Sequence, residues 1–194
     1  MRIRNDAALA FLAQRRSVPS RLLGAPGPTE PELAELLRLA VRVPDHGKLV
    51  PWRFVRIPRE SRDALAARLV ARQLERDPAT DAATLDKDRL RFAHAPLVLA
   101  VVARITAGHK IPEQEQLISA ALLGYNLVLV AQAQGYGAQW LTGWPAYDEA
   151  IARDFGLAAN ERIIAFVHIG TAQEEPPEPP RPDPASLFGD LELR

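Results

Sequence analysis

The feature that most constrains this fold is an almost unbroken apolar run over residues 117–131, in which only Ser119 and Asn126 are polar. Polar residues flank the run on both sides, and its 15 residues are fewer than the ~20 that a helix needs to cross a membrane. A helix that is apolar on every side is buried on every side. The run therefore predicts a central buried helix, ended by Gly135 and Gly137.

Two further apolar segments predict buried strands. Residues 97–103 follow Pro96, and residues 163–169 end at Gly170. Unbroken apolar runs of this length are typical of strands covered on both faces. Shorter strands are expected over residues 51–57 and 138–142, and helices over residues 60–76 and 145–155. Because these elements do not alternate regularly, we expect an α+β fold and not a doubly wound α/β fold.

Capping residues predict two helices near the amino terminus. Asn5 and Asp6 can cap a short helix that reaches Gln14. Thr29 and Glu32 form a capping box for a second helix, which Pro44 ends at or near Val43.

The length of 194 residues suits a single domain, which we expect over residues 1–174. Residues 175–194 are expected to form an extended C-terminal arm, because six prolines fall in the nine residues from Pro176 to Pro184. The absence of cysteine excludes disulfides, thiol nucleophiles and cysteine-bound metals. It also fits a cytoplasmic location, and the first 14 residues lack the apolar run of a secretory signal.

The charge of the chain is balanced in total but not along its length. There are 24 basic and 24 acidic residues, yet residues 1–62 hold 12 basic and 6 acidic ones. A neutral total argues against a nucleic-acid-binding protein. The basic first third is compatible with a site for a small anionic ligand, and it is equally compatible with ordinary surface charge.

Arg15, Arg16 and Ser17 form the first candidate site, where a helix meets a loop. Two forked guanidinium groups and a hydroxyl suit a phosphate. The alternative is a solvated helix end, where arginine is favoured by the helix dipole.

The second candidate is the loop from Arg42 to Lys48, in which His46 could contact a ligand, carry a proton or bind a metal. No second histidine lies at metal-binding spacing, so a metal is not expected. The alternative is a plain connecting loop with Asp45 in a turn.

The third candidate is the segment from Gly137 to Gly143, which contains Trp140, Leu141 and Thr142. Its flanking glycines would let a flat ligand approach the backbone. Alternatively, Trp140 is a core aromatic residue. No serine elbow or paired catalytic carboxylates occur, so a cofactor that carries the chemistry itself would suit these surroundings.

Taken in order, these segments resemble the nitroreductase family of flavoproteins, especially its short single-domain NAD(P)H nitroreductases. The resemblance spans roughly Leu9 to Phe188. It rests on a series of landmarks: Arg15-Arg16-Ser17, Arg42 to His46, Pro51-Trp52-Arg53-Phe54, the apolar helix through Asn126, Tyr136 to Trp140, and His168-Ile169-Gly170-Thr171.

The resemblance implies an α/β sandwich with a mainly antiparallel sheet and a long buried central helix. It also implies an intertwined homodimer with FMN at each subunit interface. By position, Arg15, Arg16, Ser17, Arg42 and His46 would hold FMN, with one group supplied across the dimer, and Trp140, Leu141 and Thr142 would line its ring. Residues 130–135 correspond to a stretch assigned to the nicotinamide cofactor in relatives.

The activity that the resemblance implies is hydride transfer from NADH or NADPH through flavin N5 to nitroaromatic, quinone or similar acceptors, by ping-pong kinetics. No catalytic side chain, metal, membrane or nucleic acid is implied. The alternatives are a flavin-storage protein whose ring face is blocked by residues 77–93, a flavin oxygenase or dehalogenase of the same fold, and an unrelated α+β interaction module.

Three positions depart from the family pattern. A basic residue that commonly stands two positions after the serine is Pro19 here, and Arg21 is the next basic residue. Val50 replaces a common glutamine, and Ala172 replaces a common proline. The arginine that faces flavin N1 and O2 is therefore left open.

Overall fold

The computed structural model describes residues 3–193 and contains one antiparallel sheet. Its strands are β1 (Leu23–Gly24), β2 (Trp52–Arg56), β3 (Leu97–Arg104), β4 (Gly137–Leu141) and β5 (Glu161–Ala172). They follow the order β1-β5-β3-β2, and β4 also pairs with β5. Every strand pair among the described residues is antiparallel. The expected α+β fold with an antiparallel sheet is confirmed.

The two apolar segments form the middle of the sheet, as predicted. β3 pairs with β5 from Leu97 opposite Ile169 to Arg104 opposite Glu161, with one irregularity between Val101 and Val102. Alternate residues of β3 enter two separate apolar clusters, one on each face of the sheet. This double burial explains why the sequence of β3 is apolar throughout rather than alternating.

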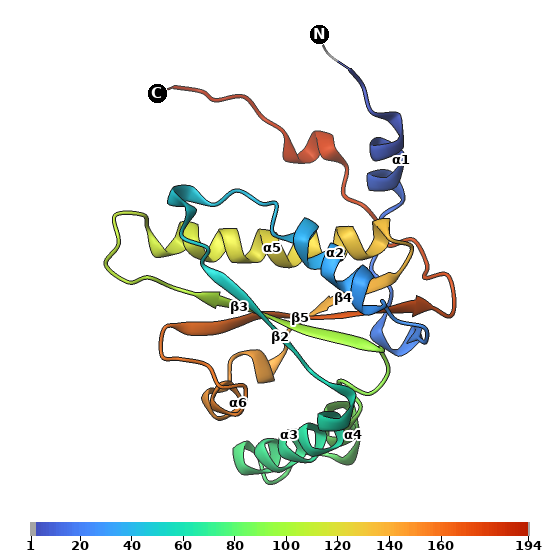
Figure 1. Cartoon of the computed structure of the whole chain (residues 1–194), viewed down its shortest axis with the longest axis vertical. Coiled ribbons are helices and arrows are strands. Elements are labelled where there is room, and N and C mark those ends of the chain that lie inside the picture. Colours follow the sequence, from blue (N-terminus) through green and yellow to red (C-terminus); the bar gives the residue numbers. More distant parts are fainter. Residues whose placement is uncertain (1–2, 194) are drawn as a thin grey trace.

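One face of the sheet is covered by α5 (Glu113–Ala133) and α2 (Glu30–Ala40), with α5 lying across the strands (Figure 1). The two polar residues of the apolar run hold the chain that follows α2. Asn126 donates to the Leu39 and Ala40 carbonyls at 3.0 Å, and Ser119 donates to the Pro44 carbonyl at 2.5 Å. By length and composition α5 could cross a membrane, but here it packs as the core helix of the predicted sandwich.

The other face is covered by α3 (Arg62–Arg76), α4 (Ala82–Arg89) and α6 (Glu149–Asp154). Arg62 is only 5% exposed and donates to four backbone carbonyls, which belong to Ile57, Phe92, Ala95 and Pro96. The guanidinium therefore ties the start of α3 to the loop that leads into β3.

Most expected elements are present with shifted ends. The two capped helices are α1 (Asp6–Gln14) and α2, with Asn5 and Thr29 as N-caps and a complete capping box at Thr29. The helix expected over 145–155 is only α6, because Trp144–Ala146 forms a separate 3-10 turn. β5 starts earlier and ends later than expected, and α4 was not predicted.

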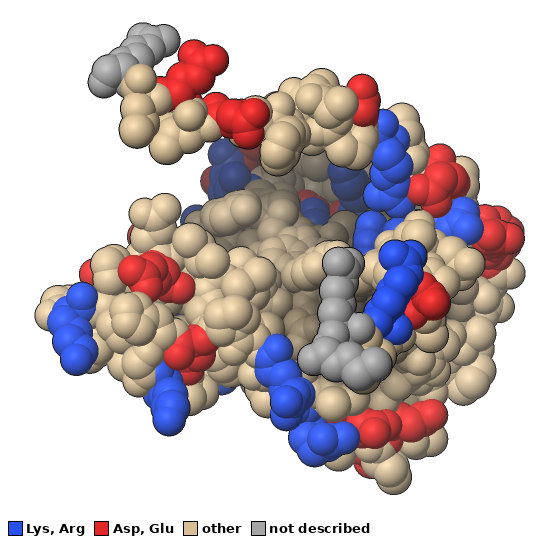
Figure 2. Space-filling view, turned by 90° about the horizontal axis from the view of Figure 1, so that it is seen from above, with Lys and Arg blue, Asp and Glu red and all other residues tan. Residues whose placement is uncertain are grey.

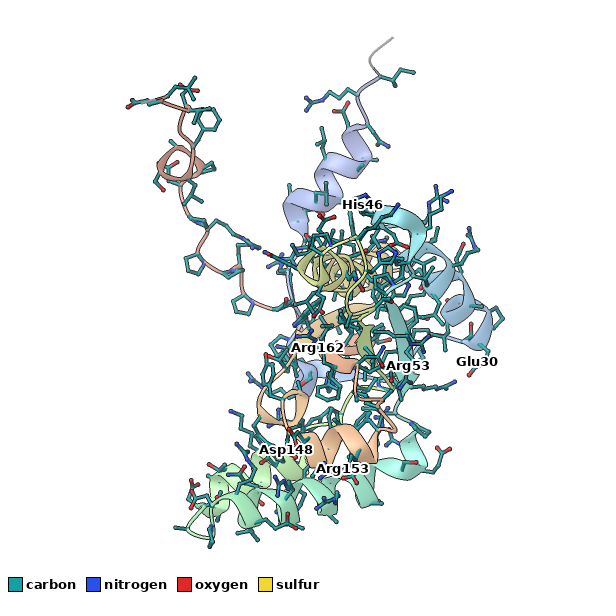
Figure 3. All side chains as sticks on the ribbon, turned by 90° about the vertical axis from the view of Figure 1, so that its left-hand side faces the viewer. Glu30, His46, Arg53, Asp148, Arg153 and Arg162 are labelled. Atoms are coloured by element: carbon teal, nitrogen blue, oxygen red, sulfur yellow. The ribbon has the colours of Figure 1, made fainter. Side chains whose placement is uncertain are left out.

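Two segments project from the body on the side of α5 (Figure 1). No residue of α1 is buried. The chain after Glu174 runs outward as an arm that is interrupted by one 3-10 turn, Pro184–Leu187, and every described residue of it except Pro176 is exposed. Figure 3 shows α1 and this arm leaving the body as separate projections. Seen from above, basic and acidic side chains are interspersed over this side of the molecule (Figure 2).

Candidate flavin site

The first and third candidate segments lie side by side. Val18 donates its backbone N–H to the Ala138 carbonyl at 3.0 Å, and the Ser20 N–H bonds to the Gln139 side-chain oxygen at 2.5 Å. The Arg15–Ser17 segment therefore enters the body at the start of β4. Of the residues predicted from the sequence, Arg15, Arg16 and Ser17 are thus brought close to the strand that carries Trp140 and Leu141.

A hollow of about 430 Å³ opens beside β4. It is lined by Pro19, Ser20, Arg21, Lys87, Leu90, Arg91, His94, Gln139 and Leu141. Four of these side chains are basic, and the floor comes from the segment predicted to face a flat ring. Two of the four, Lys87 and Arg91, lie in the segment 77–93, and His94 directly follows it. This segment forms a wall of the hollow and does not fill it.

Arg91 is the best-held cation of this hollow, and it was not identified from the sequence. It lies 2.5 Å from the carboxylate of Asp88, which is only 2% exposed and also accepts a bond from the Trp144 indole at 2.9 Å. The Arg91 guanidinium also donates to the Thr142 carbonyl at 3.4 Å. A positive group is therefore fixed at the end of β4, next to the predicted ring-lining residues.

The strand pleat directs the side chains of β4 to opposite faces of the sheet. Gln139 and Leu141 face the hollow. Trp140 packs against α5, where a Cβ added to Gly124 would lie 2.4 Å from the indole ring. The Trp140 side chain is therefore a partly buried core group, so that only its backbone is free to face a ligand in the hollow.

Arg16 is engaged by the arm. Its guanidinium donates to the Pro176 carbonyl at 2.8 Å and to the Glu175 carboxylate at 2.9 Å. Arg181 of the arm forms a second connection, because its guanidinium donates to the Arg15 carbonyl at 3.1 Å. The side chains of Arg15 and Ser17 make no hydrogen bond or ion pair with other described residues, so both remain available to a ligand.

The second candidate loop lies at the far end of α5. His46 contacts the Glu115 carboxylate at 2.7 Å, near the start of this helix (Figure 3). The Arg16 carbonyl accepts from Gln132, near its end. These helix residues are 17 positions apart, which corresponds to about 26 Å at 1.5 Å per residue. His46 is therefore far from the hollow of its own chain, and Arg42, which follows the end of α2 held by Asn126, does not line it.

Residues 130–135 form the end of α5 and the turn after it. Val130 packs against the core, and Gln134 donates to the Glu32 carbonyl at 3.2 Å. These contacts are structural. A role in binding the nicotinamide cofactor stays a prediction.

A second hollow, of about 550 Å³, lies at the start of β5, between α5 and α6. Its lining is mostly apolar, and its carboxylate Glu161 is already bound by Arg53 at 2.8 Å and Arg104 at 3.0 Å. The Arg53 hydrogen bond is the main reason that the pKa of Glu161 falls to about 2. Although larger, this hollow is lined by three carboxylates, Asp148, Glu149 and Glu161, and by a single arginine, Arg162. This excess of negative charge does not suit an anionic cofactor. Within residues 3–193, no group of side chains could hold a metal ion.

The antiparallel sheet, the buried central helix and the cationic hollow beside β4 define an α+β protein with a site for a flat anionic ligand. The same fold occurs in solved structures. A nitroreductase-like family protein from Bacillus cereus superposes with a TM-score of 0.79 at 22% identity, covering 99% of both chains. The FMN and NADPH-dependent nitroreductase NfnB superposes with a TM-score of 0.76 at 20% identity, covering 96% of this chain and 99% of NfnB.

The sequence comparison identifies the family. Residues 12–171 match the nitroreductase family, and the chain belongs to it. A relative from Escherichia coli K12, named "Putative NAD(P)H nitroreductase YdjA", is 36% identical over 166 residues, which cover 86% of this chain and 88% of the relative. The chain is therefore an oxidoreductase of the nitroreductase type, as its sequence predicted.

Proposed function

We propose that this protein is an FMN-dependent oxidoreductase that transfers hydride from NADH or NADPH to nitroaromatic, quinone or similar electron-poor acceptors, by ping-pong kinetics. The observation that carries the proposal is the cationic hollow beside β4, next to the Arg15–Ser17 segment. NfnB, which shares the fold, is FMN- and NADPH-dependent.

The residues around the hollow fit FMN in shape and charge. Arg15 and Ser17 are free to bind a phosphate, and forked guanidinium donors suit phosphate oxygens. Leu141 offers an apolar surface to a flat ring. Arg91 and Arg21 place positive charge beside that surface. The mixture of an apolar floor with a few cations is typical of cofactor sites.

When bound, FMN supplies hydride acceptance and donation at N5. The protein then has three tasks. Arg15 and Ser17 would hold the phosphate end, β4 would lie against the ring, and Arg91 would stabilise negative charge on the reduced ring. Because Asp88 and Thr142 hold the Arg91 guanidinium in advance, little reorganisation is needed when this charge develops.

A homodimer completes the site in this proposal. His46 lies about 26 Å along α5 from Arg16, so in this proposal it reaches a flavin in a second chain, together with the loop that begins at Arg42. The exposed face of α5 carries Ile118, Leu122 and Tyr125, which are 49%, 38% and 45% exposed. An apolar stripe at helical spacing on an otherwise buried helix suits contact with another subunit.

The projecting segments support the same assembly. The arm carries four apolar side chains that are 73–89% exposed: Leu187, Phe188, Leu191 and Leu193. Their contact with water is unfavourable in an isolated chain. β5 pairs with β4 only from Phe166 to Gly170, so residues 161–165 form a free strand edge next to the larger hollow. An arm from a second chain would pair with this edge and bury its own apolar residues there.

We also place the protein in the cytoplasm, which fits the absence of cysteine and the packing of α5 as a core helix. Residues 1–174 would act as one flavin-binding domain and residues 175–194 as the arm. The alternatives are a flavin-storage protein and a flavin oxygenase or dehalogenase of the same fold.

The absorption spectrum of the purified protein tests the proposal. Yellow protein that bleaches on anaerobic addition of NADH or NADPH, and recovers its colour with a nitroaromatic acceptor, is the expected result. Yellow protein that neither donor bleaches would favour storage, and protein that cannot take up FMN would refute both ideas.

Two variants test the phosphate assignment. Arg15→Ala is expected to lower FMN retention at least tenfold while leaving the dimer intact by light scattering. Arg38→Ala removes an exposed arginine on α2 that pairs with Glu35, and it should retain FMN normally. Equal FMN occupancy in both variants would show that Arg15 does not hold the phosphate.

A further inference from the structure

We infer that α4 and the turn after it form a recognition surface for an anionic group on the electron acceptor, so that carboxylate-bearing acceptors are preferred over neutral ones. The surface consists of Lys87, Leu90 and His94, and it is called the α4 face below. This inference rests on the proposed function, because it assumes that a flavin ring lies on β4.

The α4 face is one side of a helix and its last turn. Lys87 and Leu90 are three residues apart at the end of α4, a spacing that places side chains on one side of a helix. His94 follows directly after the turn of residues 90–93. All three line the same hollow as Gln139 and Leu141. A ligand stacked on β4 would therefore have the α4 face beside it.

The charges on this face are not neutralised by the protein. The neighbouring Arg91 is held by the buried Asp88 carboxylate at 2.5 Å, so its guanidinium is shared between that carboxylate and the hollow. Lys87 and His94 form no ion pair with any described residue, and both are exposed. The other carboxylate of α4, Asp86, is bound by Arg89. The α4 face therefore carries unpaired positive charge toward the hollow.

The assignment to the acceptor, rather than to FMN, follows from what other groups already provide. Arg15 and Ser17 are available for the phosphate, and Arg91 is fixed at the end of β4 by Thr142. Lys87 has no such fixed position and reaches the hollow from its rim. Leu90, which is 51% exposed, adds an apolar contact between the two polar side chains. An aromatic acid matches this pattern, with its ring toward Leu90 and its carboxylate toward Lys87 and His94.

The test uses the full-length protein loaded with FMN and two acceptors of similar size, 4-nitrobenzoate and 4-nitrobenzamide. Enzyme that has been photoreduced without air is mixed with each acceptor, and the rate constant of reoxidation is followed at the flavin absorbance. This measurement involves no nicotinamide cofactor, so donor binding cannot affect it. The measured quantity is the ratio of the two second-order rate constants, which cancels general effects of a variant on the flavin.

Lys87→Gln is expected to lower the benzoate-to-benzamide ratio about tenfold, and Lys87→Gln with His94→Gln to lower it further. Raising the salt concentration should reduce the ratio for the unaltered protein, because partly exposed charges are screened. Lys110→Gln is the matched control, since it removes one exposed lysine charge that does not line the hollow. It should leave the ratio unchanged.

Equilibrium binding gives a second readout without turnover. Benzoate should perturb the flavin spectrum of the oxidised protein at about tenfold lower concentration than benzamide does, and Lys87→Gln should abolish this difference. A ratio that is the same in Lys87→Gln and Lys110→Gln would overturn the inference while the proposed function stands. So would a Lys87→Gln protein that loses FMN, because Lys87 would then hold the cofactor. Protein that takes up no FMN would overturn the inference together with the proposed function.

Discussion

His168 offers the sharpest test of how this core is built, because it is a fully buried histidine without a polar partner. It lies in β5, opposite Val98 of β3 and Gln139 of β4, and its exposure is 0%. Neither ring nitrogen has a hydrogen-bond partner among the described residues. The ring stacks on Phe92, with centroids 5.8 Å apart and planes 12° apart.

These surroundings lower the pKa of His168 from 6.5 to about 3. Burial is the main cause, because a charged imidazole would lose its hydration without gaining a partner. The positive charges of Arg62 on α3, and of Arg91 and His94 after α4, act in the same direction. The histidine is therefore neutral in the folded protein throughout the physiological pH range.

The lowered pKa makes folding sensitive to acid. Below pH 6.5 the unfolded chain binds a proton at His168 that the folded chain does not bind, so the free energy of unfolding falls as the pH falls. The loss continues until the pH reaches the folded pKa near 3. At 1.36 kcal/mol per pKa unit, lowering the pH from neutral to 5 should cost about 2 kcal/mol through this residue alone.

Urea unfolding of wild-type protein and His168→Leu at pH 7, 6 and 5 measures this contribution. The leucine variant should lose about 2 kcal/mol less than the wild type between pH 7 and 5. Its stability at pH 7 should be equal or higher, because leucine leaves no buried nitrogen unpaired. Acid sensitivity from Glu161 and other carboxylates is common to both proteins and cancels in the difference.

His46→Gln is the control, since its ring is exposed and lies outside the core. Parallel pH dependences for wild type and His168→Leu would refute the reasoning. They would mean that the folded protein accommodates a charged His168, for example through an internal water that bonds to the ring.

Three further predictions concern the arm and the core. Arg16→Ala should make residues 175–193 more sensitive to proteolysis. The free energy of unfolding should change by less than about 1 kcal/mol, because the partner Glu175 is 80% exposed. Unchanged proteolysis would show that Arg16 does not anchor the arm. Leu123→Ala should cost about 2–5 kcal/mol in urea unfolding, because Leu123 is fully buried on α5. Gly124→Ala should cost about 1–3 kcal/mol by pushing on the Trp140 ring, and Trp140→Leu in the same chain should restore part of this loss.

The sequence predicted the elements whose physical signal is local. The run over 117–131 identified α5, because a helix that is apolar all round has to be central. The sequence did not indicate a role for the two polar residues of this run. In the structure, Asn126 binds the end of α2 and Ser119 binds the loop that follows it. Such roles depend on carbonyls about 80 residues away in sequence, which no pattern within the helix can reveal.

α4 was not predicted because it lacks an apolar stripe. Its only local signal is Asp81, which caps the helix by accepting from the Thr84 N–H at 3.0 Å. The importance of Arg91 was hidden for a related reason. Its position depends on Asp88, one helical turn earlier, and on Thr142, 51 residues later. A cation that is fixed by a distant carbonyl looks like ordinary surface charge in a sequence.

Trp140 shows the opposite case, in which the sequence left two alternatives open and the structure favours one for the side chain. The Trp140 side chain could face a ligand or the core, and only the pleat of β4 decides between these two orientations. Because Gln139 and Leu141 face the hollow, the ring between them has to face α5, where Gly124 leaves space for it. The glycine that matters most for this tryptophan lies in the helix and not beside it in the strand.

The separation of the predicted ligands along α5 is the strongest argument about assembly. Arg15 and Ser17 lie at one end of this helix, His46 lies at the other, and Arg42 lies between them. If all four residues bind one flavin, a single chain cannot contain a complete site. Two chains related by a two-fold axis would form two sites, each built from residues of both chains. Flavin retention should then depend on protein concentration near the dimer dissociation constant. A monomer that keeps FMN at high dilution would show that the Arg42–His46 loop does not contribute to FMN binding.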